Sequence, residues 1–271
     1  MSAARRPLKS LGQNFLVDGN IIDRIIRCAD IGPADSVLEI GPGRGALTGR
    51  LAQRAGRLLL VEYDHALAAA LKEQYRDEPR VTVVDGDILA VDLAALLGDA
   101  PAGWKVVANL PYNISSPVLF RLLDCRTLFS RLVLMLQREV GERLVASAGC
   151  ADYGVTTALL GLWFDMRREI SVPPGCFHPR PKVDSVVVSF VPLAEPRVEV
   201  GSEETFRRVV KGAFAMRRKT LANCLKGAGL ASADEIGAIL DACGIDGQRR
   251  GETLSLEEFA ALSRRLTGLQ T

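Results

Sequence analysis

Short apolar runs alternate with segments of helical periodicity through the first half of the chain. Between the apolar runs, hydrophobic residues recur at helical spacing, as Leu67, Leu71 and Tyr75 do. Strands that alternate with helices form a parallel sheet with both faces covered, so the pattern predicts an α/β fold. The runs of β-branched and aliphatic residues that predict strands are 36–40, 57–62, 81–85, 105–109 and 131–137.

The pattern changes in the second half of the chain. After a helix expected over 155–162, strands predicted at 163–172 and 183–191 follow each other with only a proline-rich turn between them. Two strands without an intervening helix fit an antiparallel pair at the edge of the sheet.

Helical spacing dominates the C-terminal part of the chain. Ser232 with Glu235, and Ser255 with Glu258, form capping boxes that precede apolar runs and mark helix starts. We therefore expect two domains, an α/β domain over 1–195 and a small all-α domain over 196–271.

Composition narrows the class of protein. The 271 residues are 48% hydrophobic and 24% charged, an ordinary globular mixture that excludes wholesale disorder. No apolar run approaches the roughly 18 to 20 residues that a membrane-spanning helix needs. The N-terminus lacks the apolar segment of a secretory signal, so we expect a soluble, cytoplasmic protein with no membrane partner. The six cysteines lie far apart, and with only two histidines they support neither a disulfide framework nor a metal site.

A glycine-rich turn after the first predicted strand is the strongest local feature. Gly41, Gly43 and Gly45 allow a ligand to approach the backbone closely, and the helix that follows offers unpaired N–H groups. Glu62 ends the next strand, 21 positions after Gly41, where a carboxylate can accept hydrogen bonds from ribose hydroxyls. The combination predicts an adenosine-containing ligand, whereas the simpler interpretation is a tight turn with an exposed acid.

Two further acids favour S-adenosylmethionine over a dinucleotide, although Ala46 completes a G-x-G-x-x-A string. Glu39 lies two residues before Gly41, where a carboxylate suits a cationic ligand rather than a pyrophosphate. Asp87 ends the third strand and can accept a hydrogen bond from an adenine amino group. Asp87 beside Gly86 is also typical of a simple turn, and that alternative stays open.

The fourth strand ends in Asn109-Leu110-Pro111-Tyr112, the most specific four residues in the chain. The amine of adenine is a weak nucleophile because its lone pair is delocalised into the ring. The Asn109 oxygen and the Leu110 carbonyl can each accept one amine hydrogen, Pro111 stiffens the turn, and Tyr112 offers a stacking face. The alternative is a plain proline turn after a strand, which would not require these neighbours.

Together these motifs resemble the ribosomal RNA adenine N6-dimethyltransferase family, specifically the small-subunit dimethyladenosine transferases. The resemblance implies a Rossmann-like seven-stranded methyltransferase fold that uses S-adenosylmethionine. It further implies dimethylation of two adjacent adenosines near the 3′ end of small-subunit (16S) rRNA, during maturation of the small ribosomal subunit. We expect a monomer. Besides the motifs above, the resemblance covers Leu11–Leu16, Cys176–Ser185, Met216–Leu221 and Leu254–Phe259.

The resemblance also implies roles for individual residues. It makes residues 1–19 a flap over the cofactor, although Gln13 and Asn14 could instead cap the following helix. Phe177 would face Tyr112 across an extruded base, unless Phe177 is a core residue at its turn. The residues expected to line the cofactor pocket are Asn14, Leu16, Gly41, Glu62, Asp87 and Asn109, in addition to Glu39 and Gly43 from the arguments above.

A basic block in the C-terminal domain predicts contact with RNA phosphates. Seven basic residues and no acid occur between residues 205 and 226, although the net charge of the chain is only +2. On one continuous helix Arg207, Lys211 and Arg218 would share a face, which Arg217 and Lys219 extend. A solvated helix face is the alternative.

Three other functions remain open from the sequence. A resistance-type enzyme would methylate large-subunit rRNA with the same catalytic core, and a non-catalytic RNA-binding or transcription module would share only the fold. An NAD-dependent oxidoreductase fits least, because three acids follow three successive strands.

Overall fold

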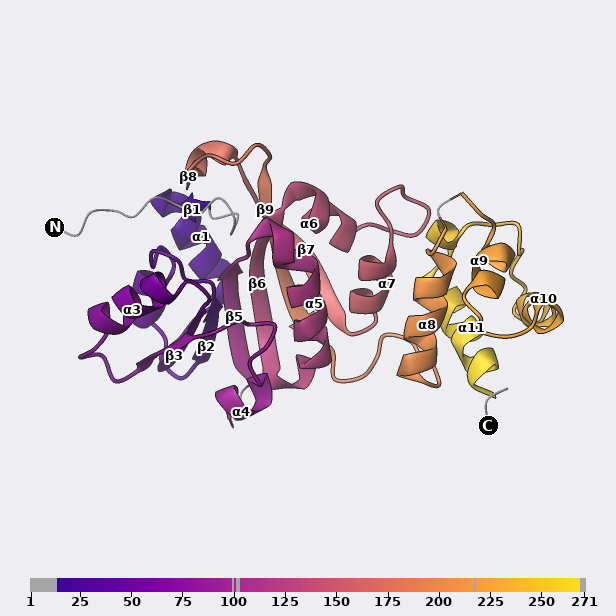
Figure 1. Ribbon diagram of the computed structural model, residues 1–271, viewed down its shortest axis with the longest axis horizontal. Coiled ribbons are helices and arrows are strands. Elements are labelled where there is room, and N and C mark those ends of the chain that lie inside the picture. Colours follow the sequence, from indigo (N-terminus) through magenta and orange to yellow (C-terminus); the bar gives the residue numbers. More distant parts are fainter. Residues whose placement is uncertain (1–13, 99, 101–102, 217, 269–271) are drawn as a thin grey trace. The chain divides into compact units, whose positions relative to one another are not determined.

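The computed structural model describes residues 14–98, 100, 103–216 and 218–268. The chain divides into two compact units, residues 1–141 with 165–192 and residues 142–164 with 193–271 (Figure 1). The sequence places one boundary after residue 195, whereas the contacts group 142–164 with the C-terminal residues. The reason is that helix α7 (Val155–Gly161) packs against helix α8 (Glu203–Ala213).

The first unit is built on strands with short connections. Its strands are β1 (Phe15–Leu16), β2 (Ser36–Ile40), β3 (Arg57–Glu62), β4 (Val81–Asp85), β5 (Trp104–Asn109), β6 (Phe129–Gln137), β7 (Phe164–Val172), β8 (Phe177–His178) and β9 (Ser185–Pro192). Its helices are α1 (Gly19–Ala29), α2 (Thr48–Ala52), α3 (His65–Gln74), α4 (Leu93–Leu97) and α5 (Ser115–Asp124), and α6 (Arg138–Leu144) begins in it.

Seven strands form one sheet in the order β4-β3-β2-β5-β6-β9-β7, and β1 pairs with β8 in a separate two-stranded ribbon (Figure 1). Pairing is parallel from β4 to β6, and β9 is antiparallel to β6. The α/β prediction and the seven-stranded fold are confirmed. The strands predicted at 36–40, 57–62 and 81–85 have the observed bounds, and the others differ by one or two residues.

Both faces of the central strands are buried, as a parallel sheet requires. Val37, Leu58 and Val107 belong to a core on one face, to which α1 contributes Ile25 and Ile26. Their strand neighbours point to the opposite face and are equally shielded from solvent, which explains why these strands read as continuous apolar runs.

The second unit is helical after residue 200. Its helices are α7, α8, α9 (Leu221–Gly227), α10 (Ala233–Ala242) and α11 (Leu256–Gly268). The Ser232–Glu235 box that the sequence predicts is present at the start of α10, and Ser255 and Glu258 exchange the same two bonds at the start of α11. Within the described residues, no helix has the length and apolar character needed to cross a bilayer.

Candidate functional site

A cavity of about 310 Å³ lies at the carboxyl ends of the parallel strands. Its position is the one expected for ligands in open α/β sheets, because β2 and β5 are neighbours whose chain connections run to opposite sides of the sheet. Every predicted cofactor residue lines this cavity. Those residues are Asn14, Leu16, Glu39, Gly41, Gly43, Glu62, Asp87 and Asn109.

The glycine loop owes its shape to left-handed backbone at Gly41 and Gly43, with φ of 64° and 59°. Such angles cost an L-residue with a side chain about 1 kcal/mol or more. A Cβ atom on Gly43 would also lie 3.0 Å from the ring of Phe15. Gly43 is therefore required both by its backbone angle and by the close approach of β1.

Glu62 ties the glycine loop to the end of β3. Its Oε2 accepts a hydrogen bond from the Gly43 N–H at 2.9 Å, and its Oε1 accepts one from the Asp64 N–H at 2.9 Å. Burial raises the pKa of Glu62, and these two hydrogen bonds act in the opposite direction. Each carboxylate oxygen keeps a second lone pair, so the group can still accept hydroxyl hydrogens from a ligand.

Glu39 is almost completely buried, with 1% of its surface exposed. Thr48 donates its hydroxyl hydrogen to Oε2 of Glu39 at 2.7 Å. Burial raises the pKa of Glu39 to about 8, and the negative charge of Glu62 adds to that increase. A cation in the cavity would favour the ionised form, so Glu39 suits a positively charged ligand.

Asp87 combines the two roles that the sequence left open. Its Oδ1 accepts a hydrogen bond from the Leu89 N–H at 2.9 Å, which is the turn-forming contact. The same residue lines the cavity, so the turn also places a carboxylate where a ligand can reach it.

The Asn109-Leu110-Pro111-Tyr112 segment follows β5 along the same cavity. Asn109 donates from Nδ2 to the carbonyl oxygen of Asn14 at 3.1 Å. A carbonyl can only accept, so this bond fixes the amide orientation and leaves Oδ1 as the acceptor available to a substrate. Tyr112 is half-buried and its hydroxyl lies 2.7 Å from the Ser185 hydroxyl, which steadies the ring; burial raises its pKa.

Phe177 does not line the cavity that Tyr112 lines. It is buried, with 4% exposure, and pairs with Leu16 across the β1–β8 ribbon rather than lining the cavity. The structure thus gives it the core position that the sequence offered as an alternative. A clamp of Phe177 with Tyr112 around a base would need Phe177 to leave that core, and it stays a prediction.

Several cavity residues were not selected from the sequence, and two of them contact each other. Phe15 and Arg44 both line the cavity, and the Arg44 guanidinium carbon lies 4.4 Å from the centre of the Phe15 ring. Nothing in the local pattern pairs residues so far apart in the chain. The sequence also suggested that Gln13 or Asn14 caps α1, whereas Asp18 does so by accepting the Ile21 N–H at 3.0 Å; Gln13 lies outside the described residues.

The basic block does not lie on one helix face, which corrects the sequence prediction. Helix α8 ends at Ala213, because Phe214 turns into contact with Tyr153 and Phe259 and a new helix begins after Thr220. Lys211 is therefore on α8, whereas Arg218 lies in the connection to α9.

The members of the block also differ in their surroundings. Arg207 forms an ion pair with Glu203 at 2.9 Å, an acid just upstream of the block. Lys211, Arg218 and Lys219 are exposed, and Arg217 lies outside the described residues. Of the four predicted RNA-binding residues that the structure describes, three are therefore exposed.

A second cavity, of about 360 Å³, lies within the second unit. Lys219, Arg143 and Arg250 supply cationic side chains to its lining, and Asp152 and Glu252 supply acids. This cavity was not predicted from the sequence, because its lining residues come from three separate segments of the chain.

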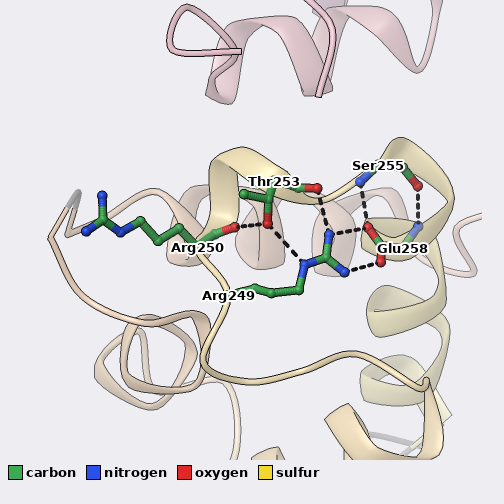
Figure 2. Close-up of polar contacts among 5 residues, drawn as sticks. All are labelled: Arg249, Arg250, Thr253, Ser255 and Glu258. Atoms are coloured by element: carbon green, nitrogen blue, oxygen red, sulfur yellow. Dashed lines mark hydrogen bonds and ion pairs between the residues drawn. The ribbon is translucent and has the colours of Figure 1, made fainter. Parts of the chain in front are cut away.

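Arg250, which lines the second cavity, directly follows Arg249, and Arg249 forms an ion pair with Glu258 (Figure 2). Arg249 binds Glu258 through both ends of its guanidinium group, with an Nη2–Oε2 distance of 3.0 Å, and also donates to the carbonyl of Thr253 at 2.6 Å. The side chain of Arg250 extends away from this pair (Figure 2). The Arg249 carbonyl accepts from the Leu221 N–H at 2.7 Å, which links this turn to the start of α9.

Comparison with known proteins agrees with the geometry. The model of the ribosomal RNA adenine dimethylase family matches residues 5–266. A ribosomal RNA small subunit methyltransferase A from Geobacter metallireducens is 59% identical over 266 residues, which cover 97% of each chain. The corresponding protein of Moorella thermoacetica is 46% identical, over 96% of this chain and 92% of its own.

Two solved structures share the fold over almost the whole chain. A dimethyladenosine transferase from Plasmodium falciparum is 27% identical with a TM-score of 0.76, covering 92% of this chain and 95% of its own. The 23S rRNA methyltransferase ErmE is 28% identical with a TM-score of 0.69, covering 93% and 99%. Because the family match spans both units and a relative is 59% identical over almost the whole chain, the chain belongs to the ribosomal RNA adenine dimethylase family.

Proposed function

We propose that this protein dimethylates the N6 amines of two adjacent adenosines in small-subunit rRNA, with S-adenosylmethionine as the methyl donor. The observation that carries the proposal is the orientation of Asn109. Its Nδ2 is engaged by the Asn14 carbonyl, so Oδ1 remains as an acceptor in the same cavity as Glu39, Glu62 and Asp87. An acceptor beside three acids suits an amine substrate and a cationic adenosine cofactor.

The cavity residues fit S-adenosylmethionine in charge and shape. Glu39 is a buried carboxyl that accepts a hydrogen bond from the neutral Thr48 hydroxyl, so a cation would balance its negative charge. Glu62 suits the ribose hydroxyls, and Asp87 suits the adenine amine. When bound, this cofactor supplies an electrophilic methyl group on a positively charged sulfur.

The protein's own contribution is positioning and electrostatics. Asn109 Oδ1 and the Leu110 carbonyl accept the two amine hydrogens and localise the nitrogen lone pair. Pro111 fixes the turn, and its carbonyl accepts the Ser115 hydroxyl at 3.1 Å. The Tyr112 ring replaces stacking that the adenine loses when it leaves its helix.

RNA contact is assigned to the second unit. Lys211, Arg218 and Lys219 are exposed cations suited to phosphate groups, with Arg207 and Arg217 as further members of the predicted set. We assign the immature small ribosomal subunit as the partner and expect a monomer in the cytoplasm. Light scattering of the free protein tests the monomer, and a stable dimer would contradict it.

Methylation of large-subunit rRNA is the second candidate, because the similarity to ErmE extends over 93% of the chain. The identity of 59% to a small-subunit methyltransferase favours the small subunit.

The deciding experiment incubates the protein and S-adenosylmethionine with small and large subunits from cells that lack these methylations. Mass mapping of the RNA should find dimethyladenosine at two adjacent positions of small-subunit rRNA. Methylation of large-subunit rRNA alone would support the second candidate, and absence of transfer to either RNA would reject both.

A further inference from the structure

Three consecutive residues of the N-terminal segment, Asn14, Phe15 and Leu16, line the cavity. Strand β1 lies beside β8 (Figure 1), and Leu16, opposite Phe177, is buried beneath it. Asn14 and Phe15 precede this buried residue and line the cavity. A ribbon of two residue pairs is too short to be stable by itself, so its course depends on side-chain contacts.

Phe15 supplies those contacts toward the glycine loop. The guanidinium carbon of Arg44 lies 4.4 Å from the ring centre, a cation–π distance. The ring also approaches the α-carbon of Gly43 so closely that a Cβ there would lie 3.0 Å from it. The ring is therefore fixed on one side by Arg44 and at its edge by Gly43.

Gly43 is itself fixed by the end of β3. Its N–H donates to Glu62 at 2.9 Å, and Glu62 is 5% exposed. The surface on which Phe15 packs is thus part of the rigid sheet end rather than an independent loop.

Asn14, the residue before Phe15, contacts Asn109 directly. Its carbonyl accepts the hydrogen bond from Asn109 Nδ2 at 3.1 Å. Without that acceptor, the Asn109 amide could turn over and present N–H groups to an amine that needs an oxygen.

We propose that Phe15 is a positioning residue for methyl transfer. Held between Gly43 and Arg44, it fixes the Asn14 carbonyl, and the carbonyl keeps Asn109 in the orientation that presents Oδ1 to the adenine amine. Phe15 acts through Asn14 and Asn109, and its role deepens the proposed function on which it rests.

The test compares Phe15→Ala, the conservative Phe15→Leu, and Arg44→Met. We expect Phe15→Ala to lower kcat about tenfold, since the net contribution of one hydrogen bond is of that size. Phe15→Leu keeps apolar bulk but loses the aromatic face, so it should fall between Phe15→Ala and wild type. Combining Phe15→Leu with Arg44→Met should cost less than the sum of the two single changes, because both remove the same cation–π contact.

A second measurement needs neither cofactor nor RNA. Nuclear magnetic resonance can follow hydrogen exchange of the Asn109 side-chain amide, whose signals are identified by their absence in Asn109→Asp. We expect exchange about tenfold faster in Phe15→Ala than in wild type, because the bond to Asn14 is lost.

Arg57→Met is the matched control. Arg57 lies over Trp104 at 4.8 Å and forms a cation–π contact outside the cavity, so its loss should change neither kcat nor Asn109 exchange. If wild type transfers methyl groups but Phe15→Ala changes neither Asn109 exchange nor kcat, the inference is wrong. Absence of methyl transfer by wild type would instead reject the proposed function.

Discussion

The cofactor cavity of the first unit and the basic surface of the second are positioned by different means. In the cavity, Glu39 and Glu62 belong to strands of a buried sheet, and main-chain or hydroxyl hydrogen bonds hold their carboxylates. On the basic surface, Lys219 lies in a connection between helices, and the Arg249–Glu258 ion pair fixes the neighbouring turn. The carboxylates at the carboxyl ends of the strands are therefore held by the sheet, whereas the backbone beside the exposed cations of the second unit is held by side-chain contacts.

This difference predicts the largest effect at Asn109. Asn109→Ala should reduce kcat about 100-fold or more, because it removes the acceptor that orients the amine. Cofactor affinity, measured by calorimetry, should fall far less. Asn20→Ala changes an exposed asparagine on α1 and serves as the control. Equal losses in kcat and cofactor affinity would contradict the assigned role.

Substitution of Glu39 should have a smaller effect than that of Asn109, and it should change how stability depends on pH. Burial raises its folded-state pKa to about 8 from 4.5, so between these values the unfolded state loses a proton that the folded state keeps. The free energy of unfolding of wild type, measured relative to that of Glu39→Gln, should therefore fall with rising pH in that window. The decrease should be about 1 kcal/mol per pH unit.

The same titration should govern cofactor binding. A cationic ligand favours ionised Glu39, so wild-type affinity should rise with pH through this window and that of Glu39→Gln should not. Denaturant unfolding and calorimetry at several pH values measure the two effects. Identical pH profiles of variant and wild type would show that Glu39 does not titrate there.

Arg249→Met should cost about 1 kcal/mol of stability, because it breaks a two-pronged ion pair that also holds a turn. Thermal unfolding should show a decrease in Tm of about 2 to 4 °C. Arg80→Met removes a comparable pair with Glu78, at 2.9 and 3.0 Å, that is exposed on the first unit. We expect the loss of this exposed, solvent-screened pair to lower Tm less than Arg249→Met does. Equal losses would show that the Arg249 pair has no special role.

Lys219→Ala should have the smallest effect, and it should appear only with RNA. Binding to small-subunit RNA should weaken a few-fold at low salt, and the slope of log affinity against log salt should decrease by about 1. Lys72→Ala, an exposed lysine on α3, should change neither quantity. An unchanged salt slope for Lys219→Ala would remove this residue from the phosphate contacts.

Local patterns in the sequence predicted the acids, the glycines and the Asn109–Tyr112 segment of the cavity. The apolar runs predicted five strands. Because parallel strands share a direction, the acids and glycines at their carboxyl ends lie on the same side of the sheet. The capping boxes at Ser232 and Ser255 were likewise readable, since their bonds join residues three positions apart.

Contacts between residues far apart in the chain could not be predicted from local sequence patterns. The end of α8 at Ala213 depends on the ring contacts of Phe214 with Tyr153 and Phe259, so the helix expected to carry Arg218 was too long. The burial of Phe177 depends on its pairing with Leu16 across more than half the chain.

The sequence by itself therefore determined the fold class, the order of strands along the chain and the chemical groups at the sheet edge, because each follows from periodicity or from neighbouring residues. Only the tertiary structure decided the direction of the Asn109 amide, the contact of Phe15 with Arg44 and the surroundings of the basic block. Those features depend on which side chains come into contact after folding, and such long-range contacts cannot be predicted from the spacing of residues along the chain.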